Sequence, residues 1–320
     1  MDLALSRLRV PSEPGNPGCD STTALGSGRL YCADNDAWRR IATDFAGSLI
    51  PPLLTPARTR GPRSFYVGAE LFMTPIVPGS DHWRRGTEGP GTASSTGENN
   101  FAESVLVWTR LELRKALPFG FELGTSLGFL PNSSYMTLGL EIRWAVLEGW
   151  LSDDWWVPDL AVRGAVQTLL GDPEFNTTVA SVDVTLSNSV IVGDELEISP
   201  YLAGQLAWTF SDTELVDLTP DRNSFALCDP EPGETVPTSG ETVPTCRGGG
   251  AGDDYNNNVV FDSLRTMRMR MIFGLQARYE VFTLTGAFSF DLVKPGEWDT
   301  SIPADIDRQY QIDVGFGLSF

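Results

Sequence analysis

The chain has no long apolar run. Its 320 residues contain no stretch of about 18 consecutive apolar residues, the length that a membrane-spanning helix needs, so we expect no transmembrane helix. Residues 1–10 include basic side chains but lack an apolar core of about 7–15 residues, and no secretion signal is visible. Either the chain begins after its signal, its start is misplaced, or the protein is not exported, and we favour the first two interpretations.

Histidine and cysteine are scarce. His82 is the only histidine, and the four cysteines form two close pairs, Cys19 with Cys32 and Cys228 with Cys246. Neither pair has metal-site spacing such as C-x-x-C, and the pattern favours two local disulfides in an oxidising compartment. The sequence also has no P-loop, dinucleotide fingerprint, zinc motif or nucleophile elbow. We therefore expect no metal, no cofactor and no enzyme activity.

Positive charge is also in short supply. Lysine and arginine total 23 against 42 aspartates and glutamates, a net charge of −19, which argues against a nucleic acid partner because phosphates would be repelled. The longest acidic stretch is 212–261, where the sequence of 233–238 is repeated without change in 240–245. Its proline and glycine content predicts an exposed acidic loop without a packed element.

The last stretch of the chain, 308–320, alternates strictly between large apolar and small or polar residues. The apolar positions are Tyr310, Ile312, Val314, Phe316, Leu318 and Phe320. The positions between them hold glutamine, aspartate, glycine and serine. Because side chains of a strand point alternately to its two faces, this pattern predicts a strand with one fully apolar face.

The same alternation returns along most of the chain. It predicts further strands at about 64–76, 102–115, 118–129, 134–147, 158–170, 176–188, 195–211, 262–279 and 281–293. Each is long enough for a tilted membrane strand of about 9–11 residues, whereas strands of soluble sandwiches average nearer to 5–6. A soluble lipocalin-like barrel is the alternative, but this many large apolar side chains would overfill its cavity.

The terminal strand, which ends the chain on an aromatic residue, resembles the C-terminal strand of bacterial outer-membrane β-barrels. The resemblance implies an all-β fold, an antiparallel transmembrane up-and-down barrel of about ten strands (range 8–12) over residues 64–320. It implies a Gram-negative outer membrane, with its lipids, its lipopolysaccharide and the barrel-assembly machinery as partners. The implied insertion signal comprises Tyr310, Phe316, Leu318 and Phe320.

Residues 1–63 read as an irregular N-terminal arm that contains one helix at about 36–49. Asn35 and Asp36 can cap this helix, Trp38, Ile41, Phe45 and Leu49 share one face of it, and the following prolines end it. The helix either enters the barrel as a plug or lies against the barrel mouth or the membrane surface, and the second is our default expectation. Residues 55–63 read as a basic linker.

Connector lengths predict the topology. The long polar connectors, 77–101, 212–261 and 294–307, all follow odd-numbered strands, and very short ones follow the second and eighth strands. In outer-membrane barrels long loops face outside and short turns face the periplasm, so an even strand count predicts that both termini are periplasmic. The connector 148–157 is longer than this rule suggests, and its Trp150, Trp155 and Trp156 would suit the lipid interface.

The polar faces of the strands predict the lumen. The lumen-facing candidates are Arg110, Glu112, Glu141, Arg143, Arg163, Arg268, Arg270, Arg278, Asp291 and Asp313. Arginines and carboxylates are nearly balanced there, which favours a narrow or filled lumen with paired side chains over a one-signed selective constriction. Arg268 and Arg270, two residues apart on one face, are the best candidates for contact with an anion.

Three functions remain open from the sequence. We expect a narrow or gated channel for small solutes or ions, with the solute unknown. The alternatives are a structural or surface-interaction barrel and an outer-membrane hydrolase with a site at the extracellular rim. A barrel of this size resembles the omptin proteases, but their paired Asp and Asp-x-His arrangement is absent, since His82 directly follows Asp81, and a plain loop histidine is the simpler expectation.

Overall fold

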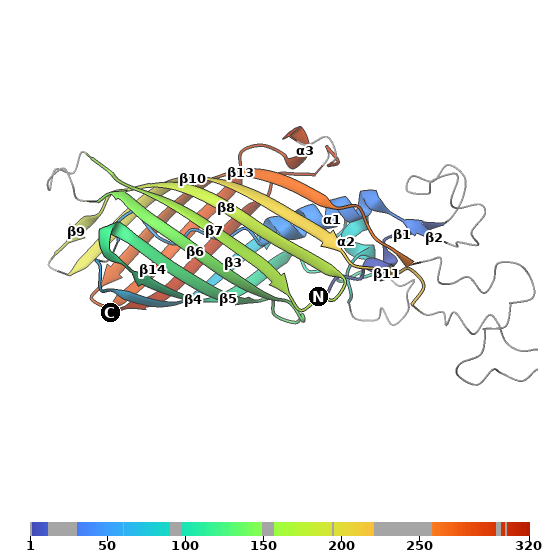
Figure 1. The fold of residues 1–320 in the computed structure, drawn as a ribbon, viewed down its shortest axis with the longest axis horizontal. Coiled ribbons are helices and arrows are strands. Elements are labelled where there is room, and N and C mark those ends of the chain that lie inside the picture. Colours follow the sequence, from blue (N-terminus) through green and yellow to red (C-terminus); the bar gives the residue numbers. More distant parts are fainter. Residues whose placement is uncertain are drawn as a thin grey trace, which may run out of the picture.

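Ten of the described strands pair in sequence order and close into one antiparallel barrel (Figure 1). The structure is a computed structural model, and it describes residues 2–11, 31–59, 61–89, 98–148, 157–193, 195–220, 258–298, 302–304 and 306–320. The barrel strands are β3 (Phe65–Pro75), β4 (Val105–Ala116), β5 (Phe121–Phe129), β6 (Met136–Leu147), β7 (Asp159–Leu170), β8 (Phe175–Ser187), β10 (Leu196–Thr213), β13 (Leu264–Tyr279), β14 (Phe282–Asp291) and β15 (Tyr310–Ser319).

Two pairings complete the ring. The last strand, β15, pairs with the first, β3, with Val314 opposite Leu71. Strand β10 pairs with β13 along its whole length, from Leu196 opposite Tyr279 to Ser211 opposite Leu264. A short strand, β9 (Val190–Val192), extends the edge of β10 at one end. The predicted ten-stranded antiparallel barrel is therefore confirmed.

The outside of the barrel is apolar. Leu140, Leu284 and Phe316 expose 63%, 56% and 51% of their surface, and similar large side chains cover every barrel strand. The residues between them face inward, so the period of two that marks the strands also separates a lipid-like surface from a polar interior. Exposure of this much apolar surface is favourable in a bilayer and not in water, which identifies the fold as a transmembrane barrel.

The connectors fall into two classes by end. The described parts of the connectors 76–104, 130–135, 171–174, 214–263 and 292–309 lie at one end, called here the loop end. Those of 117–120, 148–158, 188–195 and 280–281 lie at the opposite end, called the turn end. All three connectors predicted to be long thus share the loop end, as the odd-strand rule required. Several predicted strand boundaries differ from the structure by one to three residues. At the start of β5, Phe119 belongs to a 3-10 turn, η2 (Pro118–Gly120), with φ of 64°, rather than to a strand.

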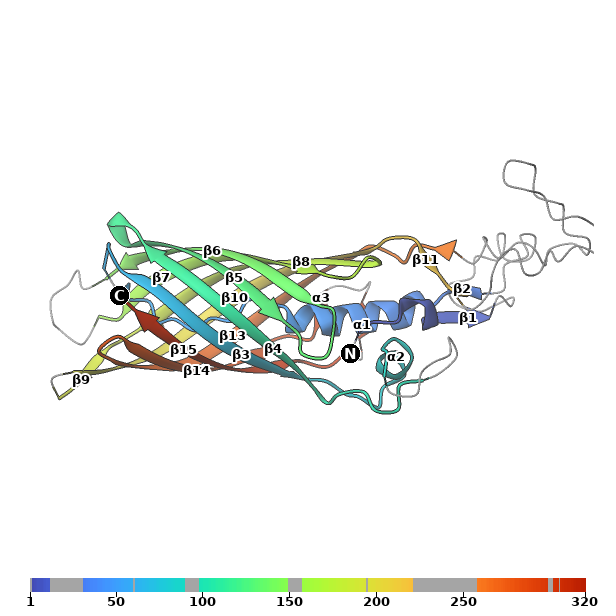
Figure 2. The same ribbon diagram turned by 90° about the horizontal axis from the view of Figure 1, so that it is seen from below.

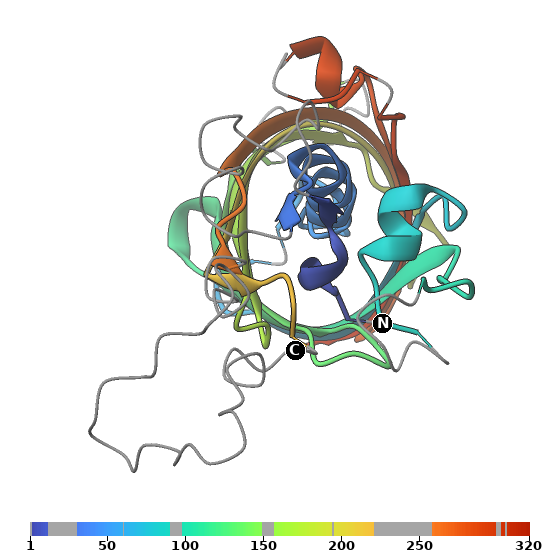
Figure 3. The same ribbon diagram turned by 90° about the vertical axis from the view of Figure 1, so that its right-hand side faces the viewer.

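The predicted arm helix, α1 (Asn35–Ser48), lies inside the barrel (Figure 3). Before it come a short turn, η1 (Leu5–Arg7), and a small hairpin of β1 (Arg9–Pro11) and β2 (Tyr31–Ala33) near the loop end (Figure 2). Asp34 caps the helix by accepting a hydrogen bond from the amide of Ala37 at 3.0 Å. The expectation of a helix against the barrel mouth is wrong, because the lumen wall supplies the apolar surface that its buried face requires.

The described chain begins and ends at opposite ends of the barrel. At the loop end, the Asp2 carboxylate accepts from the amide of Ser134, which precedes β6. At the turn end, the Phe320 amide donates to the carbonyl of Phe65 at 2.9 Å. Residues 49–63 therefore cross the lumen from α1 to the start of β3. The prediction that both termini lie on one side is wrong for this reason, since strand parity does not account for an arm that passes through the barrel.

Four small elements complete the fold: α2 (Asp81–Arg85), β11 (Val216–Asp217), β12 (Asn258–Val259) and α3 (Pro295–Trp298). No helix in the described part of the chain is long and apolar enough to cross a membrane. Cys32 is disulfide-bonded, but Cys19, Cys228 and Cys246 lie outside the described residues, so both cysteine pairings stay predictions. Also outside are Trp150, Trp155, Trp156 and the repeat in 233–245.

Candidate functional site

The loop-end half of the lumen is an apolar seat for α1. Trp38, Ile41 and Phe45 are fully buried there. Phe45 lies between three aromatic rings of the wall, with centroid distances of 5.5 Å to Tyr135, 5.8 Å to Phe175 and 6.1 Å to Trp108. Phe72 stacks on Trp108 from the neighbouring strand. The burial of these side chains anchors the helix in the barrel.

Sequence reasoning missed this aromatic seat, although a signal for it exists. Residues 71–73 read Leu-Phe-Met and residues 105–108 read Val-Leu-Val-Trp, so both strands lose their alternation near the loop end. A continuous apolar run indicates a strand buried on both faces. Here one face meets lipid and the other meets α1.

The last turns of α1 meet a cluster of donors that comprises two arginines of β13 and Gln309, which directly precedes β15. Arg268 donates to the carbonyl of Thr43 at 2.9 Å, and Arg270 donates to that of Gly47 at 2.8 Å. Gln309 donates to the carbonyl of Asp44 at 2.9 Å. The Gly47 carbonyl belongs to the last turn of α1, where helix carbonyls lack intrahelical partners. The Thr43 and Asp44 carbonyls lie one turn earlier and accept the wall donors as additional partners, near the negative pole of the helix.

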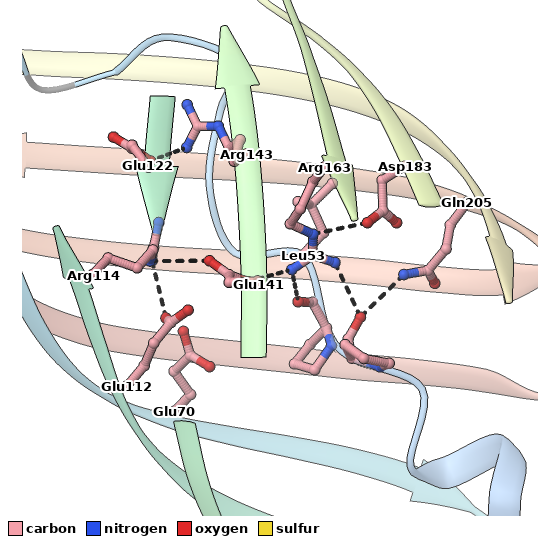
Figure 4. Close-up of polar contacts among 12 residues, drawn as sticks. Leu53, Glu70, Glu112, Arg114, Glu122, Glu141, Arg143, Arg163, Asp183 and Gln205 are labelled. Atoms are coloured by element: carbon pink, nitrogen blue, oxygen red, sulfur yellow. Dashed lines mark hydrogen bonds and ion pairs between the residues drawn. The ribbon is translucent and has the colours of Figure 1, made fainter. Parts of the chain in front are cut away.

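Beyond α1, the arm runs through the lumen as an extended proline-rich segment, 50–59 (Figure 4). Arg163 donates to the carbonyls of Pro52 and Pro51 at 2.8 and 3.2 Å, and Gln205 reaches the Pro51 carbonyl at 3.0 Å. The Tyr201 hydroxyl donates to the carbonyl of Leu53 at 2.8 Å. Since proline has no N–H group, this segment mainly offers carbonyl oxygens as hydrogen-bond acceptors. The barrel wall provides the side-chain donors that bind them.

The same segment has an apolar side. Leu53 and Leu54 are buried against a small cluster on the wall that comprises Tyr201, Ala203, Ile272 and Ala287. Further along, Arg143 donates to the carbonyls of Ala57 and Arg58, both at 2.8 Å. The stretch that the sequence presented as a basic linker is therefore bound inside the lumen as far as residue 59.

Most of the predicted lumen residues take part in buried ion pairs, called here the lumen network, and Figure 4 shows the pairs from Glu112 to Asp183 and the separate pair of Arg143 with Glu122. The pairs are Arg110 with Glu70, Arg114 with Glu112 and Glu141, Arg143 with Glu122, Arg163 with Glu141 and Asp183, and both Arg268 and Arg270 with Asp291. The arginines of these pairs are almost fully buried. A buried charge requires such a partner, because its desolvation costs several kcal/mol.

Two predicted residues lie apart from this network. Arg278 sits at the turn-end mouth, where its side chain is 37% exposed and pairs with Glu197. Asp313 is buried and accepts from the Gln311 amide at 2.7 Å. Asp313 has no arginine within ion-pair distance among the described residues.

Cavities flank the arm on both sides. The loop-end cavity, about 510 Å³, is lined by α1, α2 and 306–309 and includes Arg40, Asp44 and His82. The turn-end cavity, about 390 Å³, is lined by arm residues 55–59 and by Glu122, Arg143 and Arg278. The described arm residues lie in the lumen between these two cavities.

The predicted rim histidine contacts two polar groups. His82 Nε2 lies 3.3 Å from the Ser80 hydroxyl and 3.4 Å from the Asp44 carboxylate. The Trp83 indole also donates toward the same Asp44 oxygen, at 3.4 Å. A Ser-His-Asp relay requires the serine and the carboxylate on different ring nitrogens. Because both contacts here fall on Nε2, the arrangement joins α2 to α1 and does not form a relay.

The four residues of the implied insertion signal lie on the lipid side of β15 and at its end. Tyr310, Phe316 and Phe320 expose 45%, 51% and 68% of their surface, and Leu318 is partly exposed. They form an apolar row beside Phe282 and Phe288 of β14.

Comparisons with known proteins find only distant similarity to solved structures. No protein-family model and no curated protein matches the chain. Among solved structures, the N-terminal barrel domain of OprF from Pseudomonas aeruginosa is 8% identical with a TM-score of 0.29, covering 82% of this chain and 100% of that one. The KdgM porin is 8% identical with a TM-score of 0.28, covering 80% and 99%.

The outer-membrane protease OmpT from Escherichia coli is 7% identical with a TM-score of 0.32, covering 84% of this chain and 98% of that one. All three are bacterial outer-membrane β-barrels. At this identity, the roles of individual residues in those proteins do not transfer. The architecture of this chain rests on its own strand pairing, and it is that of a closed ten-stranded antiparallel barrel.

Proposed function

We propose that the protein is a narrow outer-membrane channel that its own N-terminal arm keeps closed. The observation that carries this proposal is the course of residues 34–59, which lie in the lumen between two cavities. The wall binds this segment largely through hydrogen bonds from arginine, glutamine and tyrosine side chains to arm carbonyls. Water or a polar solute can replace each of these bonds when the arm moves.

The polar wall supports a channel over a purely structural barrel. A barrel that stays closed would be at least as stable with an apolar core, because buried ion pairs often contribute less than well-packed hydrophobic side chains of the same volume. Here the arginines line the middle of the lumen, and their charges are matched by carboxylates. Such a wall remains compatible with water after the arm leaves.

The arm can open the lumen without leaving the molecule. The N-terminal end of α1 faces the loop end, where Asp34 pairs with Arg85 of α2 at 2.7 Å, so withdrawal toward that end is direct. Residues 49–63 remain attached to β3 and can span at most about 50 Å when extended. The opened lumen would thus retain one extended strand of chain and be narrow.

The location follows from the same features. We place the barrel in a bacterial outer membrane with the loop end outside, since long loops are extracellular in such barrels. Lipopolysaccharide would then surround the loop-end half, and the barrel-assembly machinery would recognise the apolar row of β15. This orientation exposes the described N-terminal residues outside the cell and Phe320 to the periplasm.

Single-channel conductance tests the proposal. A release variant, Trp38→Ala/Ile41→Ala/Phe45→Ala, removes the apolar anchor of α1, and each such truncation in a core costs about 2–5 kcal/mol. We expect the wild type to be closed nearly all the time and the release variant to show frequent openings. Heat-modifiable gel mobility confirms that each variant forms a barrel before it is recorded.

A reversible cross-link provides the control. Asp44→Cys/His82→Cys, added to the release variant and joined by a short bis-thiosulfonate linker, ties α1 to α2, since the two native side chains lie 3.4 Å apart. Openings should disappear with the linker and return on reduction, and the release variant without the added cysteines corrects for reduction of native disulfides. A folded release variant that stays silent would overturn the channel and favour a structural barrel.

The structural barrel is the second candidate, and the aromatic seat favours it. Trp38 is fully buried and donates from its indole to the carbonyl of Asp262 at 2.9 Å. A helix anchored this firmly needs an external trigger to move. If no condition opens the wild type, the arm serves to stabilise the barrel and to hold the loop-end surface in place.

A further inference from the structure

The C-terminal end of α1 occupies a pocket of donors that is built like an anion site. Arg268, Arg270 and Gln309 converge on the carbonyls of three residues, Thr43, Asp44 and Gly47, within 2.8–2.9 Å. We call these three wall residues, with Asp291 behind them, the helix seat. Both arginines are buried, at 1% exposure each.

Asp291 holds the two arginines of the helix seat so that their free donors point toward the arm. Arg270 Nε donates to Asp291 at 2.9 Å, and Arg268 Nη1 pairs with the other oxygen of the same carboxylate. The backbone amide of Gln309 also donates to Asp291, at 3.0 Å. Since Asp291 holds both guanidinium groups from one side, their Nη2 groups are the atoms that reach α1.

The helix seat has an excess of positive charge. Two arginines share one carboxylate, Asp291. The next carboxylate, Asp313, binds Gln311 instead of either arginine. In addition, Arg268 Nε is buried and has no hydrogen-bond partner among the described atoms. What α1 supplies in return is the partial negative charge of its last carbonyls, which is weaker than that of a full anion.

We propose that the helix seat binds a small oxyanion, a carboxylate or phosphate group, when α1 withdraws. Two converging guanidinium groups and one amide match the oxygens of such a group, because arginine presents paired donors in a plane. In the resting barrel, the helix end stands in for the anion. An anion would therefore compete with the end of α1 for these donors and favour the open state. An anion that crosses the open lumen would meet the donors of the helix seat on its way.

This inference rests on the proposed withdrawal of the arm, but its test does not require conduction. Isothermal titration of inorganic phosphate into full-length protein in detergent measures the site directly. We expect no measurable binding to the wild type, where the seat is filled, and saturable binding to the release variant. Tryptic cleavage after Arg39 or Arg40 of α1 reports that the helix has left the lumen.

Matched variants identify the site. In the release background, Arg268→Gln/Arg270→Gln should weaken phosphate binding at least tenfold. Arg265→Gln, on the same strand but 50% exposed and paired with Asp212, should leave binding unchanged. If the triple release variant does not fold, the milder Ile41→Ala/Phe45→Ala variant replaces it in every arm of the experiment.

The outcomes separate this site from the channel. Phosphate binding that depends on Arg268 and Arg270 without any current would keep the site and overturn the channel. Current without phosphate binding, or binding that survives the double arginine substitution, would overturn the site and leave the channel. More frequent openings in the presence of inorganic phosphate, together with arginine-dependent binding, support both.

Discussion

Gly47 shows how one missing side chain lets the arm approach the wall. A Cβ at this position would lie 2.9 Å from Arg268 Cζ and closer still to the Gln309 side chain. The Gly47 carbonyl can accept from Arg270 only because the helix comes this close. Glycine at position 47 therefore allows close contact with the helix seat, although glycine has a low helix propensity.

The first prediction separates these two effects. By propensity alone, Gly47→Ala should stabilise α1 by up to about 1 kcal/mol. We expect the opposite, a loss of about 1–3 kcal/mol from overpacking against Arg268, measured as faster tryptic cleavage at Arg39 and Arg40. Arg39→Lys, on the exposed face, keeps a tryptic site and controls for changes in cleavage itself. Slower cleavage of Gly47→Ala would show that the seat does not constrain the helix.

Glu174 carries the second prediction, outside the membrane at the loop end. Partial burial, and then the nearby Asp172 and Asp217, raise the pKa of Glu174 above its ordinary 4.5. A raised pKa in the folded protein means that folding disfavours the ionised carboxylate. The resulting loss of folding stability is absent below pH 4.5, where the carboxyl is protonated in both states, and grows as pH rises through the folded pKa. At neutral pH the ionised Glu174 thus destabilises its surroundings.

Glu174→Gln should remove that cost. We expect a higher urea midpoint than that of the wild type at pH 7, and no difference at pH 4, measured by the gel mobility of the folded barrel. Because Glu174 is only partly buried, the effect should be modest. Glu214→Gln, on a more exposed neighbour in the same region, is the control. An equal shift at both pH values would rule out ionisation of Glu174 as the cause.

At the scale of elements, the N-terminus of α1 depends on one residue with two roles. One oxygen of Asp34 caps the helix through the Ala37 amide at 3.0 Å, and the other accepts from Arg85 of α2 at 2.7 Å. We expect Asp34→Ala to weaken α1 by about 1 kcal/mol for the cap, together with the lost contact to α2. Hydrogen exchange of the α1 amides measures this.

Asparagine distinguishes the two roles of Asp34. Asp34→Asn retains a capping oxygen but removes the charge that faces Arg85, so its effect should be smaller than that of alanine. Asp36→Ala, which removes a more exposed first-turn carboxylate, should cost least of the three. If alanine and asparagine had the same effect, the contact with Arg85 would be the only role that matters.

The elements differ in how far the sequence predicts them. The barrel strands follow from alternation, because lipid outside and polar groups inside impose a period of two on each strand. The helix follows from its apolar face, but that face says only that Trp38, Ile41 and Phe45 are buried, not against which surface. The segment 50–59 has no period at all. Its place in the lumen depends on carbonyl contacts with Arg143 and Arg163, which no local pattern encodes.

The candidate site shows the same limit. The sequence placed Arg268 and Arg270 on one face with Asp291 available nearby, because strand geometry fixes such positions. It could not show that the partner of these arginines is the end of α1, since those residues are separated by more than two hundred positions in the chain. Pairing across the lumen is a property of the closed ring and of the arm within it.

At the scale of the whole molecule, the arm that crosses the lumen determines on which side of the membrane the N-terminal residues lie. Asp2 is held at the loop end by Ser134, whereas the connector 188–195 and Phe320 lie at the turn end. An epitope tag at the N-terminus and one inserted after Gly193 should therefore be exposed on opposite sides of the membrane. The internal tag avoids altering the terminal strand, whose apolar row is the implied insertion signal.

Antibody labelling of intact and permeabilised cells measures both positions. We expect the N-terminal tag to be labelled on intact cells and the tag after Gly193 only after permeabilisation, because the loop end should face outside. A third tag in the 233–245 segment reports the loop end independently, and it should label like the N-terminal tag. If the N-terminal tag instead labels like the tag after Gly193, the arm does not cross the lumen in the membrane, and the plug and the helix seat would both be excluded.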